Sequence, residues 1–257
     1  MDAKRAIFVA PFDELVDPRL LAELAALAER QAWDGFFVWD HIRYREPVQA
    51  VADPWVVLAA IAVATERLRI GPMVTPIARR RVQNLARETA TLDLLSRGRL
   101  TLGVGLGSDR SRELSTFGEE LDPRARAKLL DDGLARLAEF WDGEFLPKPV
   151  QQPRIPVWAA ARWPKRRPLQ RAARWDGLFP IEVPSPEDLA TLAAELQELR
   201  EQAGTADRPF DLVAEIEPGA AARPWVEAGA TWVFIGFGHV PRADQVRAVI
   251  EAGPPRD

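Results

Sequence analysis

The sequence contains no cysteine, only two histidines and a single tyrosine among its 257 residues. Without cysteine the chain cannot form disulfides, thiolate zinc sites or a cysteine nucleophile. The histidines, His41 and His239, belong to no H-x-H or H-E-x-x-H pattern, so we predict no metal site. A G-x-S-x-G elbow is also missing, which removes the usual support for a Ser-His-Asp triad.

A strong charge bias and long apolar runs are absent as well. The net charge of -4 argues against a dedicated nucleic-acid binder. No apolar run approaches the roughly 18 residues that a membrane span needs, and the first run, "AIFVAPF" (6–12), is too short for a signal peptide. We therefore expect a soluble, cytoplasmic protein with neither a nucleic-acid nor a membrane partner.

Short apolar segments alternate with longer amphipathic ones along the whole chain. Asp17-Pro18 and Asp53-Pro54 each supply a cap and a proline at the start of a helix. Strands are predicted at 6–12, 35–40, 67–74, 99–107, 155–161, 177–181, 210–216 and 231–237. Helices are predicted at 17–33, 53–65, 82–96, 124–141, around 166–175, and at 187–202, 222–228 and 243–252.

Eight strand–helix units favour a closed (β/α)8 TIM barrel with a parallel sheet. The proline-rich stretch at 146–156 resembles a domain boundary, but the alternation resumes directly after it. We therefore interpret residues 1–257 as a single barrel domain. The competing fold is a Rossmann-like open sheet, which would place G-x-G-x-x-G after the first strand. That strand ends in "APFDE", and "GVGLGS" (103–108) has the wrong spacing and follows the fourth strand.

Asp40 and His41 follow the second predicted strand, at the end where a barrel carries its active site. Histidine is the side chain that most readily gains or loses a proton near neutral pH, so His41 is a candidate for proton transfer. A helix cap followed by a surface histidine explains the same pair equally well.

Glycines mark the ends of the third and fourth strands. Gly71 and Pro72 interrupt the third strand, either as a bulge that brings the backbone close to a flat ligand or as an ordinary strand exit. The fourth strand ends in "GVGLGSD" (103–109), whose alternating glycines either leave a shelf for a planar ligand or permit tight packing inside the barrel.

A basic cluster follows the fifth predicted strand: Arg162, Lys165, Arg166 and Arg167. It coincides with a helix N-terminus, where free N–H groups and the helix dipole already favour an anion. A phosphate site explains this placement better than a solvated loop, which remains the alternative.

Taken together, these segments resemble the luciferase-like monooxygenase superfamily of flavin- and coenzyme F420-dependent oxidoreductases on a TIM-barrel fold. The similarity is dense over residues 31–109 and 153–180. Its most specific parts are "ATERLRIG" and the A-R-E-x-A-T-L-D-x-L-S-x-G-R-L-x-L-G-V-G pattern. Relative to that superfamily the chain is shortened, near 142–150 and around 217–230.

The resemblance implies a flavin-type cofactor over the ends of the second to fourth strands. A catalytic pair, Asp40 and His41, would lie beside its ring, and a bulge, often a non-proline cis peptide, would fall near Pro72, Met73 and Val74. Further cofactor contacts would come from Gly105, Gly107 and Ser108, and the phosphate would be bound by Ala160, Ala161, Arg162, Lys165 and Arg166.

The chain departs from the superfamily pattern at two places. Some F420-dependent dehydrogenases carry a catalytic glutamate just after the strand-four glycines, where this chain has Ser108. A Gly-Gly pair that often approaches the phosphate is replaced by Ala159-Ala160-Ala161-Arg162. Because alanine restricts the backbone, we expect the arginines to matter more here.

We therefore expect an oxidoreductase or monooxygenase that uses F420 or FMN on a small organic substrate, and the Asp-His pair inclines us slightly to F420. A non-catalytic flavin carrier and a phosphate-ester isomerase or lyase remain alternatives. We also expect a homodimer through 53–65 and 82–96, because the first of these helices is apolar nearly all round.

Overall fold

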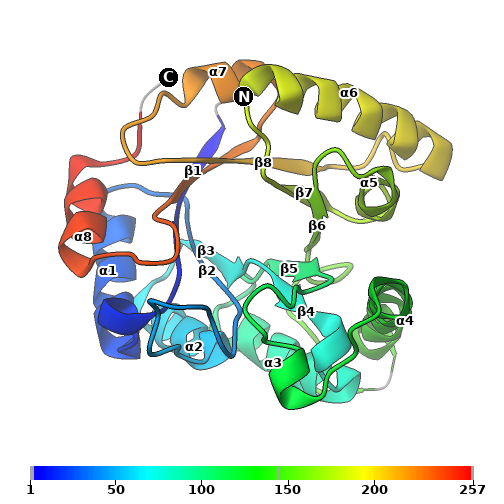
Figure 1. The fold of residues 1–257 in the computed structure, drawn as a ribbon, viewed down its shortest axis with the longest axis horizontal. Coiled ribbons are helices and arrows are strands. Elements are labelled where there is room, and N and C mark those ends of the chain that lie inside the picture. Colours follow the sequence, from blue (N-terminus) through cyan, green and yellow to red (C-terminus); the bar gives the residue numbers. More distant parts are fainter. Residues whose placement is uncertain (1–2, 144, 256–257) are drawn as a thin grey trace.

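Parallel strands form a ring with helices outside it in the computed structural model, which describes residues 3–143 and 145–255 (Figure 1). The strands are β1 (Lys4–Val9), β2 (Gly35–Val38), β3 (Arg69–Pro72), β4 (Thr75–Pro76), β5 (Leu102–Gly105), β6 (Val157–Arg162), β7 (Gly177–Ile181), β8 (Asp211–Ile216) and β9 (Trp232–Gly236).

The sheet order is β3-β2-β1-β9-β8-β7-β6-β5-β4, and every strand pair is parallel. β3 and β4 are two parts of one barrel position, separated by a cis peptide between Met73 and Val74. Ile70 bridges to Leu100 just before β5, and Thr75 pairs with Val104 on β5. These contacts bring the two ends of the sheet together, so the predicted (β/α)8 TIM barrel is confirmed.

The helices lie between successive barrel strands, and their capping follows the sequence. Asp17, Asp53 and Asp122 each accept hydrogen bonds from first-turn N–H groups, and each precedes a proline at the start of a helix. The helices are α1 (Pro18–Arg30), α2 (Pro54–Ala64), α3 (Val82–Leu95), α4 (Pro123–Asp142), α5 (Arg166–Ala172), α6 (Pro186–Ala203), α7 (Arg223–Glu227) and α8 (Ala243–Ala252).

The proline-rich connector before β6 is tied to α3 rather than leading to a separate sheet. Buried Asp93 accepts hydrogen bonds from the Val150 backbone N–H at 2.8 Å and the Gln151 side chain at 2.7 Å. After the connector, β6 pairs with β5 in register, Leu102 with Val157. The strands on either side of the connector therefore belong to the same barrel.

Side chains alternate between the barrel interior and the helix layer, as strand geometry requires. Phe37 stacks on Phe234 with ring centroids 4.5 Å apart, and Trp158 lies beside both rings. Gly177 leaves space for this packing, because a Cβ there would lie 2.3 Å from Trp158 Cδ1. The interior cluster consists of Ala6, Phe8, Phe37, Met73, Trp158, Phe179, Val213, Trp232 and Phe234.

A second and larger apolar layer fills the space between the strands and the surrounding helices. Leu21, Leu24 and Ala28 of α1 and Leu58 and Ile61 of α2 are fully buried in it. In the described part of the chain, no helix combines the length and the apolar character needed to cross a membrane.

Candidate active site

The carboxyl ends of the parallel strands lie together at one end of the barrel, which we call the mouth. Phe8 and Phe234, deeper in the barrel, are almost completely buried. The inward-facing side chains nearer the carboxyl ends of the strands are partly or largely exposed, and water therefore reaches the interior from this end. These side chains are Trp39, Val74, Ala160, Ile181 and Glu215.

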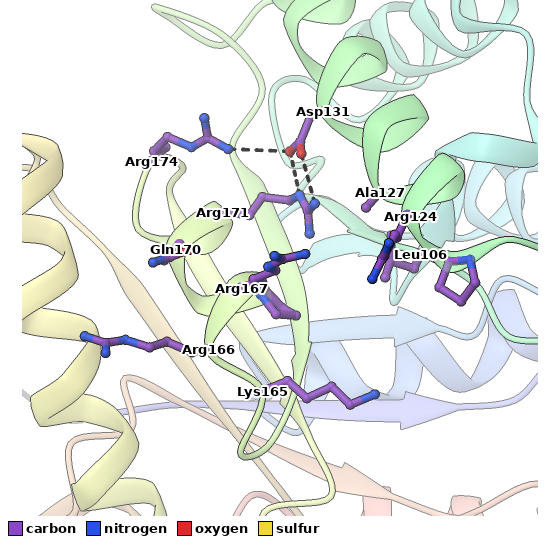
Figure 2. Close-up of a pocket in the computed structure, with 12 residues that line it drawn as sticks. Leu106, Arg124, Ala127, Asp131, Lys165, Arg166, Arg167, Gln170, Arg171 and Arg174 are labelled. Atoms are coloured by element: carbon purple, nitrogen blue, oxygen red, sulfur yellow. Dashed lines mark hydrogen bonds and ion pairs between the residues drawn. The ribbon is translucent and has the colours of Figure 1, made fainter.

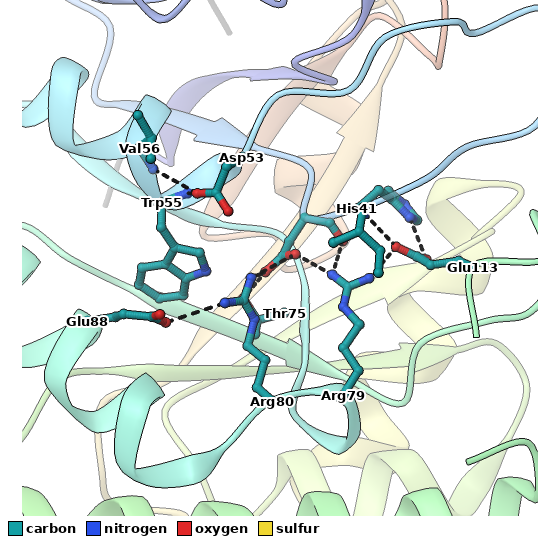
Figure 3. Close-up of polar contacts among 11 residues, drawn as sticks. His41, Asp53, Trp55, Val56, Thr75, Arg79, Arg80, Glu88 and Glu113 are labelled. Atoms are coloured by element: carbon teal, nitrogen blue, oxygen red, sulfur yellow. Dashed lines mark hydrogen bonds and ion pairs between the residues drawn. The ribbon is translucent and has the colours of Figure 1, made fainter. Parts of the chain in front are cut away.

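Asp40 lies just beyond β2 and is held by groups from the segment around β4. Its carboxylate accepts a hydrogen bond from Thr75 Oγ1 at 2.7 Å and pairs with Arg79, and Arg80 Nη2 lies 3.1 Å from Oδ2 (Figure 3). The side chain has no exposed surface. Its oxygens therefore position Arg79 and Arg80 and are not presented to a ligand.

Glu113, on the loop after β5, joins this network to His41. Its Oε2 lies 2.9 Å from His41 Nδ1, its Oε1 accepts from the Ile42 backbone N–H at 2.8 Å, and Arg79 pairs with the same carboxylate (Figure 3). The Glu113 side chain is 1% exposed, whereas that of His41 is 25% exposed. The imidazole is thus the part of this network that a ligand can reach.

Electrostatics keep Glu113 ionised. Burial by itself would raise its pKa, but the hydrogen bond and charge of His41, the charge of Arg79 and the Ile42 N–H together lower it. An ionised carboxylate only accepts hydrogen bonds, so His41 Nδ1 must carry the hydrogen between them. Nε2 is then the nitrogen that remains for exchange of a proton.

Aromatic rings fix the orientation of His41. Its ring centroid lies 5.0 Å from that of Tyr44, 5.9 Å from Trp39 and 6.0 Å from Phe12. Tyr44 also contacts the ring of His239 on the loop after β9. The chain's two histidines, far apart in the sequence, therefore lie on the same side of the mouth.

A cis peptide bond lies where the resemblance implied one, between Met73 and Val74. The glycines of β5 allow the segment around Met73 and Val74 to pack closely against this strand. A Cβ on Gly103 would lie 2.5 Å from Met73 Sδ, and one on Gly105 would lie 2.7 Å from Val74 Cγ2. The chain's own side chains thus fill the space beside these glycines, which is the tight-packing interpretation of the "GVGLG" segment.

Beyond β5 the chain turns at Gly107, which has a φ of +70°, and Ser108 Oγ accepts a hydrogen bond from the Arg110 N–H at 3.2 Å. Arg110 also reaches Glu182 after β7, at 3.3 Å. Of the residues expected to contact the cofactor here, Gly105 lies within β5, Gly107 forms the turn and Ser108 lies beside Arg110.

The predicted basic cluster divides into two parts. Arg162 ends β6 on the inward-facing row that includes Trp158 and Ala160, and it pairs with Glu182. Hydrogen bonds from Arg162 are the main cause of the lowered pKa of Glu182. Ala161 faces the opposite way, buried in the helix-facing layer, so only its backbone can approach a ligand in the mouth.

Lys165, Arg166 and Arg167 line a groove of about 1020 Å³ between α5 and the start of α4 (Figure 2). Arg166 points toward α6, where its Nε lies 3.1 Å from Glu195. Among the described residues that line the groove, Asp131 is the one acid, and Arg171 and Arg174 pair with it. The groove is therefore strongly cationic, and Leu106, just past β5, places one end of it near the mouth.

Several charged residues of the mouth were not identified from the sequence, among them Arg79, Glu113 and Glu215. Arg79 follows β4 in the run "ARRR", and Glu113 lies eight residues past the end of β5. The sequence signal for Arg79 and Glu113 was their position: both are charged residues that follow the carboxyl end of a barrel strand, where the active site of such a barrel lies. Glu215 gave a more specific signal, as an acid within the apolar strand "FDLVAEI".

Fold and site together define a (β/α)8 barrel with a histidine–carboxylate pair at the carboxyl ends of its strands. The sequence profile of the luciferase-like monooxygenase family matches residues 8–229. The chain belongs to this family.

Two mycobacterial relatives illustrate the range of similar sequences. An uncharacterised Mycobacterium tuberculosis protein is 30% identical over 264 residues, covering 90% of this chain and 91% of that protein. The phthiodiolone/phenolphthiodiolone dimycocerosates ketoreductase of the same species is 28% identical over 237 residues, covering 75% of this chain and 60% of the relative.

Solved structures share the fold at lower sequence identity. An F420-dependent secondary alcohol dehydrogenase, in complex with an F420–acetone adduct, superposes with a TM-score of 0.84 at 18% identity, over 100% of both chains. The oxygenating constituent of 3,6-diketocamphane monooxygenase from Pseudomonas putida, in complex with FMN, gives 0.71 at 14% identity, over 86% of this chain and 69% of the other. Enzymes with this fold therefore include users of F420 and users of FMN.

Proposed function

We propose that this protein is an oxidoreductase that binds a flavin-type cofactor at the mouth and acts on a small organic substrate bearing a carbonyl or hydroxyl group. The observation that carries the proposal is His41. Its Nδ1 is fixed by an ionised, buried carboxylate, while its ring remains partly exposed beside the strand ends. A fixed imidazole with one free nitrogen is suited to general acid–base catalysis.

The side chains present fit such a cofactor. Ala160 and Val74 are small or apolar, which suits a planar ring. Arg110 and Arg162 both pair with Glu182, so the two positive charges exceed the single negative charge there, which suits a phosphate. We propose that Pro72, Met73 and Val74 contact the ring. Gly105 and Gly107 would contribute backbone contacts only, because Val74 and Pro76 fill the space beside them, and Ser108 would follow them. The phosphate side would be formed by Arg162, the Ala160–Ala161 backbone and Lys165, whose backbone N–H bonds to the Arg162 carbonyl oxygen. Arg166 would join them only by leaving Glu195, with which it pairs in this structure.

When bound, the cofactor supplies the redox chemistry: hydride transfer if it is F420, or oxygen activation if it is FMN. His41 Nε2 gives a proton to the substrate oxygen or takes one from it. Glu113 keeps the imidazole ring in one orientation, and Asp40 acts one step further away by holding Arg79. The aromatic interior below the mouth keeps water from the barrel side of the reacting groups.

F420 is the cofactor we favour. An imidazole fixed for proton transfer meets the need of hydride exchange with a ketone or alcohol, in which the substrate oxygen gains or loses one proton. The likeness to an F420-dependent secondary alcohol dehydrogenase over the whole chain, and the sequence similarity to a ketoreductase, support the same choice.

The test is a titration of the purified protein with F420 and, separately, with FMN, followed by visible absorption. We expect F420 to bind, and we expect the bound cofactor to be reduced or oxidised by a secondary alcohol or a ketone such as isopropanol or cyclohexanone. Binding of either cofactor without turnover of any donor would favour the non-catalytic carrier. Failure of both cofactors to bind would overturn the proposal.

A further inference from the structure

A second ionisable side chain, Glu215 on β8, reaches the mouth from the side opposite the edge of the barrel formed by β3 and β4. It alternates with Val213, which belongs to the interior aromatic cluster, so its side chain faces inward. It pairs in register with Phe234 and lies over Gly236. A Cβ on Gly236 would be 2.3 Å from Glu215 Oε1, so the absence of a side chain there makes room for the carboxyl group.

The surroundings of Glu215 supply no countercharge. Its inward-facing neighbours on β7, β9 and β1 are Phe179, Phe234 and Phe8, whose rings contact one another. In residues 3–143 and 145–255, no hydrogen bond or ion pair to the Glu215 carboxyl is formed. The ionisable groups on the adjoining loops are Glu182, held by Arg162 and Arg110, His239, packed on Tyr44, and exposed Glu217.

Burial raises the pKa of Glu215 to about 7, and no neighbouring charge opposes this effect. The side chain is open to the water of the mouth on one side, and the aromatic wall of Phe8, Phe179 and Phe234 lies on the other. At neutral pH a large fraction of these carboxyls therefore carry a proton, and a protonated carboxyl donates one hydrogen bond.

We infer that Glu215 recognises the substrate: its protonated carboxyl donates a hydrogen bond to an oxygen of an uncharged molecule bound against the aromatic wall. The inference rests on the proposed function and specifies its substrate class as neutral and apolar, with an oxygen acceptor. His41 and Glu215 then act from two sides of the mouth, the first on the proton of the reaction and the second on substrate binding. An anionic substrate is disfavoured, because it meets an acid without a compensating cation on this side.

The first experiment follows the carboxyl directly in the full-length, cofactor-free protein. Carboxyl carbon NMR of glutamate-labelled protein should show one signal that titrates near pH 7 and disappears in Glu215→Gln. Glu251→Gln, which removes an exposed carboxyl from α8, is the matched control and should leave that signal unchanged. A Glu215 signal that titrates near pH 4 to 5, as an ordinary glutamate does, would overturn the inference.

The second experiment uses two probes of the same shape, cyclohexanone and cyclohexylamine, with binding followed by tryptophan fluorescence. Cyclohexanone should bind the wild type at pH 6 and lose affinity as the pH passes 7. In Glu215→Gln, whose amide donates at every pH, the affinity should be retained and independent of pH, whereas Glu215→Ala should bind about tenfold more weakly, as expected for one hydrogen bond.

Cyclohexylamine binding that strengthens as the pH rises and is abolished in Glu215→Gln would show that an ionised carboxylate binds a cation. That result would contradict the inference. Ketone affinities that are equal in all three proteins, or no ketone binding by the wild type, would also contradict it. Failure of the proposed function looks different, because neither F420 nor FMN then binds while the Glu215 signal still titrates near pH 7.

Discussion

His41 and Arg162 approach the mouth from different strands, and their contacts imply different tasks. Replacing Arg162 with alanine removes a charge-assisted contact to phosphate worth roughly 1.5–3 kcal/mol, so cofactor affinity should fall about ten- to hundredfold. His41→Ala leaves that contact intact and should instead lower the rate at saturating cofactor by roughly a hundredfold or more. Spectroscopic titration followed by turnover at saturation measures both quantities.

Arg136→Ala is the control for loss of a positive charge, because Arg136 is an exposed residue of α4 whose described contacts, with Glu139 and the Phe140 ring, lie within its own helix. It should change neither affinity nor rate. The assignment of His41 is wrong if His41→Ala binds the cofactor poorly yet turns over normally once saturated. The imidazole would then be part of the wall of the cofactor site.

Glu113 links the stability of the fold to pH. Its pKa is lowered in the folded protein, so its stabilising contribution is complete above the pKa of the unfolded chain and is lost as the pH falls through the folded value. Glu113→Gln should lower the free energy of unfolding at pH 7 by about 3 kcal/mol, since Arg79 then loses one of its two buried partners.

Urea unfolding at pH 7 and at pH 3.5 measures this contribution. The difference between wild type and Glu113→Gln should shrink at the lower pH, because pH 3.5 lies below the ordinary pKa of a glutamate and the unfolded chain then binds a proton at Glu113. If the free energies of unfolding of wild type and Glu113→Gln differ by the same amount at both pH values, the charge of the carboxylate does not stabilise the fold.

The elements were predictable because each depends on local signals. Apolar runs located the barrel strands, and Asp17-Pro18 and Asp53-Pro54 located the starts of α1 and α2. Gly71 and Pro72 indicated an interruption of the third strand, but the cis peptide between β3 and β4 was expected only through the resemblance, because periodicity does not report a peptide bond isomer.

The site was predictable only in part, for a physical reason. His41 and Glu113 are 72 positions apart, and Arg79 and Glu113 are 34 apart, so their pairing depends on how β2, β4 and β5 meet in space. The predicted basic cluster divides because its members belong to different elements. Arg162 ends a strand and faces inward, whereas Lys165 begins the helical segment that lines the outer groove.

At the scale of elements, the joint between β3 and β5 should tolerate no added side chain at Gly71. A Cβ there would lie 1.9 Å from the carbonyl oxygen of Thr101, and backbone cannot yield as a flexible side chain does. Gly71→Ala should therefore lower the free energy of unfolding by about 3 kcal/mol or more, the upper range for overpacking. Chemical denaturation with circular dichroism measures it.

Gly118→Ala separates this steric effect from backbone strain. Gly118 has a φ of +70° and no atom within 4 Å of an added Cβ, so the substitution should cost only about 1 kcal/mol. Equal losses for the two variants would mean that the strands at Gly71 can separate without penalty.

For the whole molecule, the exposed apolar side chains of α2 and α3 favour the homodimer expected from the sequence. Val56 is 59% and Val63 74% exposed on one face of α2, and Leu94 and Leu95 are each 45% exposed at the end of the adjacent α3. A helix that buries one face in a barrel does not need a second apolar face, and exposed patches of this kind mark interaction surfaces.

Wild-type protein at micromolar concentration should therefore have the mass of a dimer by light scattering. Val63→Glu places a charge at the most exposed of these four apolar side chains and should shift the protein to monomer, because an unpaired charge in an apolar interface is costly. Val240→Glu adds the same charge at an exposed valine on the loop after β9 and should leave the dimer intact. A wild-type monomer would show that α2 is apolar for a reason other than self-association.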